Sequence, residues 1–471
     1  ELRRRHPRFF YEGFERSPYG PRRDALRLRF RFRLESSDGP DLAFAPEIII
    51  EGAEGKRCQQ IPGPLLENLF FHLGLIEAFS YWKAACSPEI VVTPPESAPI
   101  RALDAAQLAW WGDLLRKGMG EYFYVNQIDF RSPDLVRLRA SRDLNCGTRG
   151  PQRSELRIPD GERRSLVLTS GGKDSAVTLE TLRAAGQPFD CLLVNPTPAA
   201  LDVAKQAGCE QPILVRRNLD PRLLELNAAG YLNGHTPFSA LLAFLGVTVA
   251  ALFGRRRVMV SNERSAEEAT VAYLGAQINH QYSKTYEFET AFRDYCRKYL
   301  APEIEYFSLL RPLYELQIAR RFANYPAYFP LFRSCNRGQK DNAWCGQCPK
   351  CLFVWTALYP FLEREQMLGI FGRDLFAPQS ATQRLRELLG QDASKPFECV
   401  GTREETVAAI HLCVEKYRQQ GIPLPPALET VRQTVLAART DLPALARRIL
   451  ASWSEQHHLP ADLAEQLRRN R

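Results

Sequence analysis

The segment that most constrains the fold of this chain is a glycine-rich turn that lies between a strand and a helix. Residues 166–169 form an apolar run that predicts a buried strand, and residues 174–185 have the residue spacing of a helix. The turn between them has the sequence Ser170-Gly171-Gly172-Lys173-Asp174-Ser175. The first N–H groups of a helix have no partner within the helix, and the helix dipole is positive at that end. The segment therefore predicts an anion-binding site.

The residue types of this turn suit a phosphate group. The two glycines allow the backbone to approach a phosphate closely, and the two serines offer hydroxyl donors. Asp174 is placed to hold a Mg²⁺ ion that neutralises the charge of the leaving phosphates. The glycine spacing differs from that of the Walker loop and from that of the dinucleotide-binding fingerprint. We therefore expect a nucleotide site of another kind.

Strand and helix patterns alternate after the turn. In chain order they are a strand at 166–169, a helix at 174–185, a strand at 190–195, a helix at 199–207 and a strand at 212–215. Such alternation is typical of a parallel sheet with both faces covered. The apolar run 237–253 has the composition of a membrane span, but a strand at 258–260 follows it at once. We expect this run to be a buried crossover helix, and we expect no membrane partner.

Three regions of different character are predicted. A polar run rich in glycine and proline, residues 141–164, indicates a boundary. Residues 1–150 mix strand and helix patterns and are expected to form an α+β substrate domain. Residues 160–360 are expected to form the parallel-sheet domain, and residues 361–471 a helical C-terminal region. The expected fold class is therefore α/β, with an α+β N-terminal domain and a helical C-terminal region added to the parallel-sheet domain.

The positive charge of the chain is concentrated near its start. The net charge is +8, yet the first 33 residues alone hold 11 arginines against four carboxylates. Apolar residues alternate there with a row of arginines, as in a half-buried strand with a basic outer face: Arg27, Arg29, Arg31 and Arg33. This face is either solvated or contacts an anion or another subunit. Because the remaining residues are nearly balanced in charge, we expect no nucleic-acid partner; the sequence carries no signal for an oligomeric state.

Four of the 12 cysteines crowd into one short segment: Cys335, Cys345, Cys348 and Cys351. Four thiolates at the spacing C-x9-C-x2-C-x2-C can close a tetrahedron around Zn²⁺, which predicts a structural metal site. An iron–sulfur cluster and a redox or persulfide-carrying pair remain open alternatives. The other eight cysteines are scattered, and we expect them to be buried small apolar residues. Neither a disulfide framework nor a signal-peptide pattern is present, so we expect a cytoplasmic protein with reduced thiols.

Two polar strings have the residue types of a reaction centre. Residues 262–268 include Glu263 and follow the strand at 258–261, so they emerge where open α/β sheets bind ligands. The alternative is a capped helix start, with Ser265 as the N-cap and Glu268 three residues later. In residues 279–284, His280 is suited to proton transfer and Lys284 to binding a carboxylate or phosphate; they share a face if the segment is helical. A structural role for His280 is the alternative.

The turn at 170–175 resembles the signature Ser-Gly-Gly-x-Asp-Ser of the PP-loop ATP pyrophosphatases. The resemblance implies an adenine nucleotide alpha hydrolase-like fold, cleavage of ATP between its α and β phosphates, and an adenylylated substrate. In that family the adenine lies over the end of the next strand, which implies that Asn195 contacts the nucleotide. The Cys-Gly-x-Cys-x-x-Cys spacing at Cys345–Cys351 resembles the zinc site of the 7-cyano-7-deazaguanine synthases, which are PP-loop enzymes too.

Taken together, the motifs at 80–83, 170–175, 262–268, 279–284 and 334–336 resemble the UDP-N-acetyl-α-D-muramoyl-L-alanyl-L-glutamate epimerases. The resemblance implies an enzyme of peptidoglycan precursor synthesis that uses ATP and Mg²⁺ to adenylylate the terminal L-glutamate carboxylate. Inversion at Cα would follow, with release of AMP and diphosphate. It further implies proton transfer or carboxylate binding by His280 with Glu263 or Lys284, and a UDP-linked muramyl dipeptide as the substrate. Tyr81, Trp82 and Lys83 would line its pocket, unless they belong to the core.

The competing function is that of a nucleobase- or RNA-modifying PP-loop enzyme, either like the 7-cyano-7-deazaguanine synthases or a tRNA-modifying enzyme. An enzyme that binds tRNA needs a broad basic surface because phosphate contacts dominate its affinity. The charge of this chain is confined to the N-terminal arginines. If those arginines contact a ligand, the diphosphate of a UDP-linked substrate fits them better than a nucleic acid.

Overall fold

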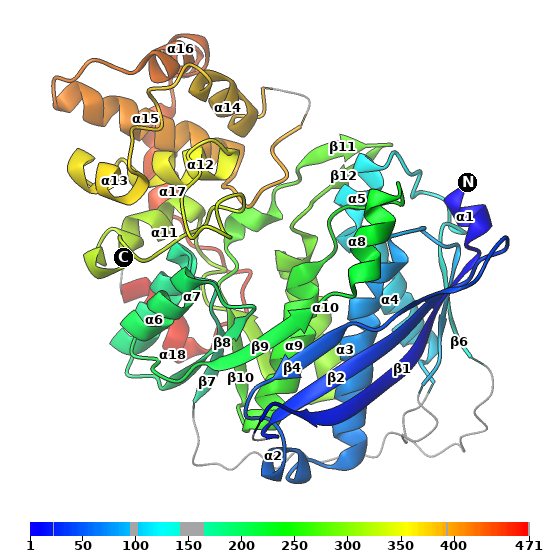
Figure 1. Ribbon diagram of the computed structural model, residues 1–471. Coiled ribbons are helices and arrows are strands. Elements are labelled where there is room, and N and C mark those ends of the chain that lie inside the picture. Colours follow the sequence, from blue (N-terminus) through cyan, green and yellow to red (C-terminus); the bar gives the residue numbers. More distant parts are fainter. Residues whose placement is uncertain (22, 95–101, 142–163, 392–393, 470–471) are drawn as a thin grey trace.

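A single large sheet runs through the molecule (Figure 1). The computed structural model describes residues 1–21, 23–94, 102–141, 164–391 and 394–469. The strands are β1 (Arg8–Tyr19), β2 (Ala25–Leu34), β3 (Leu42–Phe44), β4 (Glu47–Ile50), β5 (Glu89–Val92), β6 (Arg137–Ala140), β7 (Ser165–Leu168), β8 (Phe189–Val194), β9 (Ile213–Asn218), β10 (Arg257–Val260) and β13 (Glu305–Ser308). Within the described residues they form an 11-stranded sheet in the order β13-β10-β7-β8-β9-β4-β2-β1-β5-β6, with β3 paired to β2.

The sheet is mostly parallel, which confirms the mixed α/β class. Strands β13, β10, β7, β8 and β9 are parallel neighbours, as are β1, β5 and β6. The antiparallel pair β4–β9 joins the strands of residues 1–150 to those of residues 160–360. The division into these regions remains a prediction, and nearly all of the expected boundary at 141–164 lies outside the described residues.

The two halves of the sheet differ in how their faces are covered. In β7, Leu166 belongs to one hydrophobic core and its neighbour Val167 to a second core on the opposite face. In β2, by contrast, the apolar residues face one core and the arginines alternate with them on the other side, as predicted. A parallel sheet with helices on both faces therefore continues into an antiparallel pair with one solvated face.

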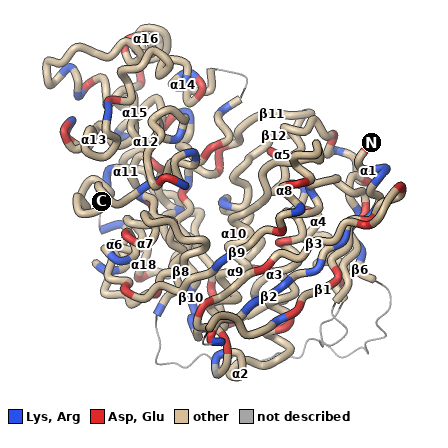
Figure 2. Tube along the Cα trace, viewed as in Figure 1, with Lys and Arg blue, Asp and Glu red and all other residues tan. Residues whose placement is uncertain are grey.

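Carboxylates of neighbouring strands pair with the arginines of β2. Arg31 binds Glu15 at 2.8 Å and Arg33 binds Glu12 at 2.6 Å. Figure 2 shows acidic and basic residues along β1 and β2, which are neighbouring strands. The local excess of positive charge is thus partly offset within the sheet itself.

Two helices form the centre of the first core: α3 (Gly63–Trp82) and α9 (Phe238–Phe253). Thirteen of the sixteen residues of α9 are buried, and Gly246 lets the helix approach β10, because a Cβ there would lie 2.8 Å from Val258 Cγ1. The expected buried crossover helix is confirmed. Among the described helices, none is long and apolar enough to cross a membrane.

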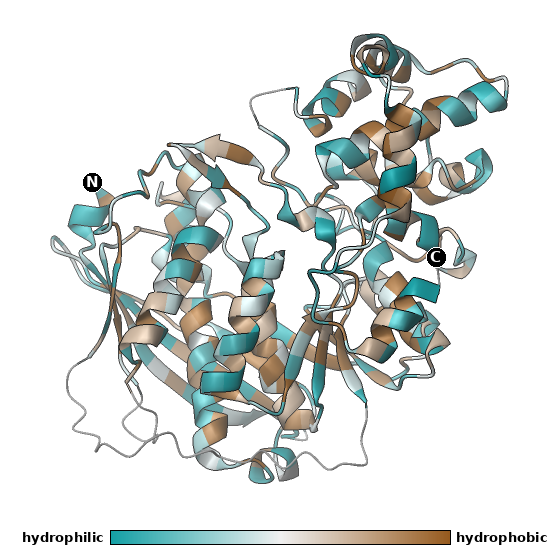
Figure 3. Cartoon of the chain, turned by 180° about the vertical axis from the view of Figure 1, so that it is seen from behind, coloured by the Kyte–Doolittle hydropathy of each residue, from teal (hydrophilic) through white to brown (hydrophobic). Residues whose placement is uncertain are grey.

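The remaining helices surround the sheet and build a helical lobe. Those that accompany the sheet are α1 (Leu2–Arg5), α2 (Lys56–Gln59), α4 (Ala105–Gly118), α5 (Gly120–Val125), α6 (Lys173–Ala184), α7 (Pro198–Gln206), α8 (Pro221–Ala228) and α10 (Tyr286–Tyr295). The C-terminal ones are α11 (Glu315–Phe322), α12 (Pro349–Leu358), α13 (Arg364–Phe371), α14 (Ala381–Leu388), α15 (Arg403–Gln419), α16 (Pro426–Thr434), α17 (Leu442–Ala451) and α18 (Ala461–Arg469). Figure 1 shows α12 to α16 in a lobe beside the sheet, and Figure 3 shows the hydrophobic residues concentrated on the inner helices and strands. The predicted helical C-terminal character agrees with this arrangement.

Candidate active site

The glycine-rich turn has the predicted position between β7 and α6, and neighbouring segments hold it closely. Gly171 has a φ of +79°, and a Cβ there would lie 2.6 Å from the backbone nitrogen of Ala200 in α7, so only glycine fits. The Gly171 carbonyl accepts a hydrogen bond from Arg333 N at 3.0 Å. Ser175 Oγ accepts from Ser170 N at 3.1 Å and lies 3.3 Å from Ser170 Oγ. The turn is therefore a preformed loop at the carboxyl end of β7.

The side chain of Lys173 is buried and contacts two carboxyl groups. Its ammonium group binds Glu315 and also Asp174 Oδ1 at 2.5 Å. Lys173 and Glu315 are both buried, whereas Asp174 is partly exposed. Burial and the nearby Asp174 carboxylate raise the pKa of Glu315 to about 8. Lys173 thus orients Asp174, the residue expected to hold Mg²⁺.

Three adjacent strands deliver functional groups to one edge of the sheet. The loop follows β7, Glu263 follows β10 and Glu315 follows β13, and these three strands are parallel neighbours. Glu263 is 3% exposed, and its Oε1 has no hydrogen-bond partner among the described residues. Burial raises the pKa of Glu263, while the Lys284 ammonium group opposes the shift. The sequence analysis identified Glu263 but missed Glu315, which the same rule about strand ends would have found.

The segment after Glu263 is not the capped α-helix start that was the alternative interpretation. It is a 3₁₀ helix, Arg264–Glu267, and Ser265 lies inside it. Ser265 Oγ instead accepts a hydrogen bond from Glu315 N at 3.0 Å, and Glu268 binds Lys395 at 2.9 Å. The segment therefore links the strand ends to the C-terminal region.

His280 and Lys284 do not share an α-helical face, because residues 280–281 form a turn and Tyr282–Lys284 a 3₁₀ helix. His280 Nδ1 lies 2.7 Å from Thr270 Oγ1, and its buried Nε2 has no partner among the described residues. Burial and the Lys284 charge lower the pKa of His280 to about 3, so the imidazole is neutral. Lys284 Nζ donates to Gln281 Oε1 at 3.2 Å and to Cys399 Sγ at 3.0 Å.

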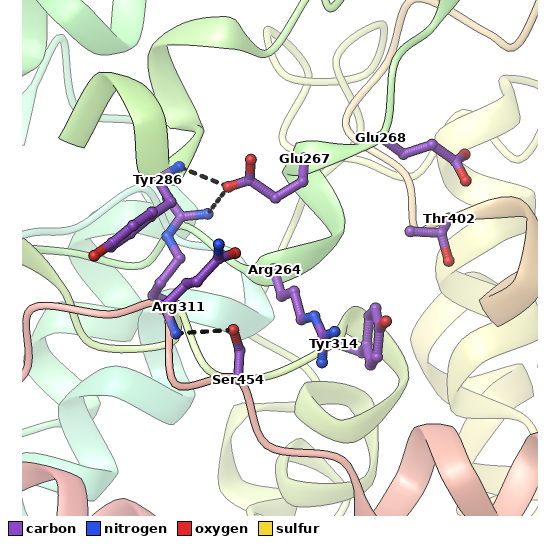
Figure 4. Close-up of a pocket in the computed structure, with 9 residues that line it drawn as sticks. Arg264, Glu267, Glu268, Tyr286, Arg311, Tyr314, Thr402 and Ser454 are labelled. Carbon is purple, nitrogen blue, oxygen red and sulfur yellow. Dashed lines mark hydrogen bonds and ion pairs between the residues drawn. The ribbon is translucent and has the colours of Figure 1, made fainter. Parts of the chain in front are cut away.

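Arg311 joins the two polar strings, and the sequence analysis missed it. Its buried guanidinium donates to the backbone carbonyl of Glu263 at 2.9 Å and to that of Lys284. It also binds Glu267, whose carboxylate accepts from Tyr286 N at 2.6 Å. Figure 4 shows Arg311, Glu267 and Tyr286 together on one side of a cavity of about 320 Å³. The cavity lies beside the segment that follows Glu263 and is lined by Arg264, Glu267, Glu268, Tyr286, Arg311, Tyr314, Thr402, Ser454 and Gln456.

The four clustered cysteines come together as predicted, with all Sγ atoms within 4.8 Å of one another. The separations are 3.4 Å for Cys348–Cys351, 3.7 Å for Cys345–Cys351 and 3.9 Å for Cys335–Cys348. Four sulfurs around a single Zn²⁺ at 2.3 Å lie about 3.8 Å apart, so the cluster fits one tetrahedral ion. Backbone N–H groups point at the sulfurs; for example, Gly338 N lies 3.2 Å from Cys335 Sγ. Such donors stabilise thiolates.

The cysteine cluster holds segments on both sides of the candidate site. Arg333, which binds Gly171, lies two residues before Cys335. Lys350, which lies between Cys348 and Cys351, donates its backbone N–H to Glu398 at 3.0 Å, next to Cys399. The chemistry of the donors and their burial fit a structural ion rather than a reacting one.

The other residues that were expected to contact the nucleotide or the substrate bind or pack against other parts of the protein instead. Both polar atoms of the Asn195 side chain bind the backbone of Arg217, at 2.8 and 3.0 Å. Tyr81 and Trp82 are fully buried core residues, which excludes them from lining a pocket, while Lys83 Nζ binds the Gly234 carbonyl at 2.9 Å. The scattered cysteines are buried as expected except for Cys58 and Cys399, which are half-buried; Cys146 lies outside the described residues.

Comparison with known proteins places this site in a family. The family model described as the MurL N-terminal domain matches residues 4–309, and the one described as the MurL C-terminal domain matches residues 331–441. The chain belongs to the MurL family. The MurL N-terminal match ends just beyond β13 and includes the glycine-rich loop at 170–175, and the C-terminal match contains the four cysteines.

Three MurL relatives bear the name UDP-N-acetyl-alpha-D-muramoyl-L-alanyl-L-glutamate epimerase. The protein from a Micromonospora species is 37% identical over 400 residues, which cover 84% of each chain. That of Salinispora tropica is 39% identical over 361 residues, covering 76% of this chain and 75% of the relative. That of Xanthomonas oryzae pv. oryzae is 36% identical over 345 residues, covering 72% of each. No solved structure matches the chain.

Proposed function

We propose that this MurL-family chain is an ATP-dependent epimerase of peptidoglycan precursor synthesis. Its substrate would be UDP-MurNAc-L-Ala-L-Glu, and it would invert the Cα of the terminal glutamate. Two findings support this proposal: the names of the three relatives, and the convergence of the phosphate loop, Glu263 and Lys284 at one edge of the sheet. The convergence carries the proposal because a group proposed to bind the nucleotide and groups proposed to transfer a proton lie at the same edge of the sheet.

The loop at 170–175 would bind ATP, as in the PP-loop fold. The two serine hydroxyls would donate to phosphate oxygens, and Asp174, which Lys173 orients, would hold Mg²⁺. ATP would supply the adenylyl group that activates the glutamate carboxylate, with release of diphosphate. The side chain of Asn195 is hydrogen-bonded to the backbone of Arg217. The contact between Asn195 and the nucleotide would therefore come from the backbone of Asn195.

Activation of the carboxylate explains why an epimerase would use ATP. A free carboxylate makes its neighbouring Cα–H very weakly acidic, because deprotonation would build a dianion. An acyl-adenylate removes that charge, and its carbonyl delocalises the electron pair that remains after proton loss. Since alanine acylates the glutamate nitrogen, the activated acid could also cyclise to an oxazolone with a still more labile proton. Water would then release the inverted acid and AMP.

The charge states in the site suit these steps. Lys284 keeps its ammonium charge, because Cys399 and Glu263 offset the effect of burial on its pKa, so it can bind a carboxylate or phosphate. His280 is a neutral imidazole whose unpartnered Nε2 can form a hydrogen bond with the substrate. Glu263, whose pKa is raised, can exchange a proton. These three residues are the proposed catalytic groups.

Each region of the chain would contribute to the reaction. Residues 1–150 would bind substrate: Glu121 and Lys83 come from this region, and His235 Nδ1 lies 4.0 Å from Glu121 Oε2. Residues 160–360 would hold the nucleotide, and the four cysteines would hold a structural Zn²⁺ that positions the segments around them. Residues 361–471 would contribute Cys399 and α15 to the edge of the site. A cytoplasmic location and a lack of nucleic-acid partners belong to the same proposal.

The proposal is tested by incubating the chain with ATP, Mg²⁺ and UDP-MurNAc-L-Ala-L-Glu in D₂O. We expect AMP, diphosphate and a D-glutamyl product that carries deuterium at Cα. Inversion without deuterium would exclude the deprotonation route. AMP formed only with 7-carboxy-7-deazaguanine and ammonia, or only with tRNA, would assign the chain to the competing PP-loop functions.

A further inference from the structure

Cys399 lies inside the candidate site although no motif marks it in the sequence. The residue is half-buried and precedes α15, and its Sγ accepts a hydrogen bond from Lys284 Nζ at 3.0 Å. Its neighbour Glu398 is tied to the metal-site segment through Lys350 N at 3.0 Å. The thiol is therefore held against a fixed ammonium group, in a position that remains partly accessible.

Two buried polar atoms near Cys399 have no partner among the described residues. They are Oε1 of Glu263, which is 3% exposed, and Nε2 of His280, which is 8% exposed. Glu263 interacts electrostatically with both Cys399 and Lys284, and the His280 ring lies beside the backbone of Glu398. Buried polar atoms in a folded protein normally have partners. Two such atoms near the thiol are therefore available to bind polar groups of a ligand.

The charges around Cys399 favour the thiolate. Burial raises the pKa of the thiol, but the ammonium groups of Lys284 and Lys350 outweigh this effect and Asp174 opposes them only in part, so the pKa falls to about 7. Glu263 and Glu121 also face the sulfur, and the pKa of Glu121 is raised to about 7 by burial and by Cys399. Near neutral pH, a large fraction of Cys399 is thus ionised, and the sulfur is a base matched to the working pH.

We propose that Cys399 is a catalytic base that takes the Cα proton of the activated glutamyl group. This inference rests on the proposed function. The Cα–H bond breaks as an S–H bond forms, and the electron pair moves onto the carbonyl oxygen of the activated carboxyl. A proton from a second acid or from water then reaches the opposite face of Cα, and the thiol returns its proton to solvent. Lys284 has a double role, since it keeps the sulfur ionised and lies beside the substrate acid.

The first test compares Cys399→Ser with Cys58→Ser in the full chain. Cys58 is also half-buried, but its pKa is raised to about 11 and its Sγ donates to the Ala53 carbonyl at 3.1 Å, away from the site. With ATP, Mg²⁺ and the muramyl dipeptide substrate in D₂O, we expect Cys399→Ser to release diphosphate at a rate close to wild type. Its deuterium incorporation at Cα should fall by about 100-fold to 10,000-fold, the usual contribution of a general base. Cys58→Ser should match wild type in both readouts.

The two readouts separate the two proposals. If the wild type releases no diphosphate with this substrate, the proposed function fails whatever Cys399 does. If diphosphate release is normal and Cys399→Ser still exchanges deuterium at the wild-type rate, the role of Cys399 is overturned.

A second measurement uses wild-type folded protein, so it stands even if the serine variant does not fold. The pH dependence of iodoacetamide alkylation, resolved by peptide mass spectrometry, should have a midpoint near 7 at Cys399. Bound substrate with ATP should slow this alkylation at least about tenfold, because the sulfur contacts the substrate. The midpoint should rise in Lys284→Met. A midpoint as high as that of Cys58, or alkylation that the substrate does not slow, would contradict the proposal.

Discussion

Replacing Arg217 by methionine should destabilise the folded chain by about 3–4 kcal/mol at pH 7, because it leaves a buried carboxylate without its partner. Glu77 in α3 is 0% exposed. Arg217 in β9 binds it through two hydrogen bonds of 2.8 Å and also donates to Ser80 Oγ at 2.9 Å. This ion pair connects a helix of residues 1–150 to the parallel half of the sheet that carries the glycine-rich loop.

The magnitude follows from the two states available to the orphaned Glu77. If the carboxylate stays ionised, breaking a buried pair costs about 3–5 kcal/mol. If it takes up a proton instead, a carboxyl with an ordinary pKa near 4.3 costs about 3.7 kcal/mol to protonate at pH 7, and about 1 kcal/mol at pH 5. Burial already raises the pKa of Glu77, against the effect of Arg217. A carboxyl group whose pKa is higher in the folded state than in the unfolded state stabilises the fold at low pH. The stability lost in Arg217→Met should therefore become smaller as the pH falls from 7 to 5.

Arg216→Met is a matched control. Arg216 precedes Arg217 in the same strand, but its side chain is 51% exposed and pairs at 2.8 Å with a Glu51 side chain that is 39% exposed. An exposed pair contributes only about 0–1 kcal/mol. Urea unfolding followed by tryptophan fluorescence would measure the free energy of unfolding of both variants at pH 7 and pH 5. Equal losses in the two variants, or a loss in Arg217→Met that does not change with pH, would refute the reasoning.

Three further predictions concern the site. Arg311→Lys should lower kcat by about 100-fold with little change in the KM for ATP, because a lysine side chain cannot reach the carbonyls of both Glu263 and Lys284. An unchanged kcat in steady-state assays would contradict this prediction. Because the pKa of Glu315 is raised to about 8, its neutral form stabilises the fold below its ordinary pKa, and this contribution is lost as the pH rises towards 8. Glu315→Gln should therefore flatten the decline of Tm between pH 5 and pH 8 in calorimetry, and an equally steep decline would exclude that role. Cys345→Ser should reduce the metal content measured by elemental analysis and lower Tm, as should a chelator added to wild type, whereas a variant with full metal content would overturn the ligand assignment.

Features that depend on neighbouring residues could be predicted from the sequence. The loop at 170–175, the alternation in β2 and the buried helix α9 each depend on the periodicity or spacing of consecutive residues. The cysteine cluster belongs to the same class, because its ligands lie within one short segment. In each of these cases, local geometry alone decides which groups can meet.

The segment at 279–284 shows where local pattern fails. Helical spacing would place His280 and Lys284 on one face, but Thr270 binds His280 and Arg311 binds the Lys284 carbonyl, so the chain forms a turn and a 3₁₀ helix instead. Both partners come from other elements. Tertiary hydrogen bonds therefore outweigh the weak preference of six residues for a helix.

The sequence by itself determined the glycine-rich loop between β7 and α6, the parallel α/β units and the cluster of four cysteines. Only the tertiary structure decided that β4 pairs with β9 to make one continuous sheet, and that Cys399 meets Lys284 and the carboxylates at its edge. The physical reason is that burial and the pairing of charges depend on residues more than 100 positions apart, such as Lys284 and Cys399. A thiol becomes a base at neutral pH only after folding has placed ammonium groups around it.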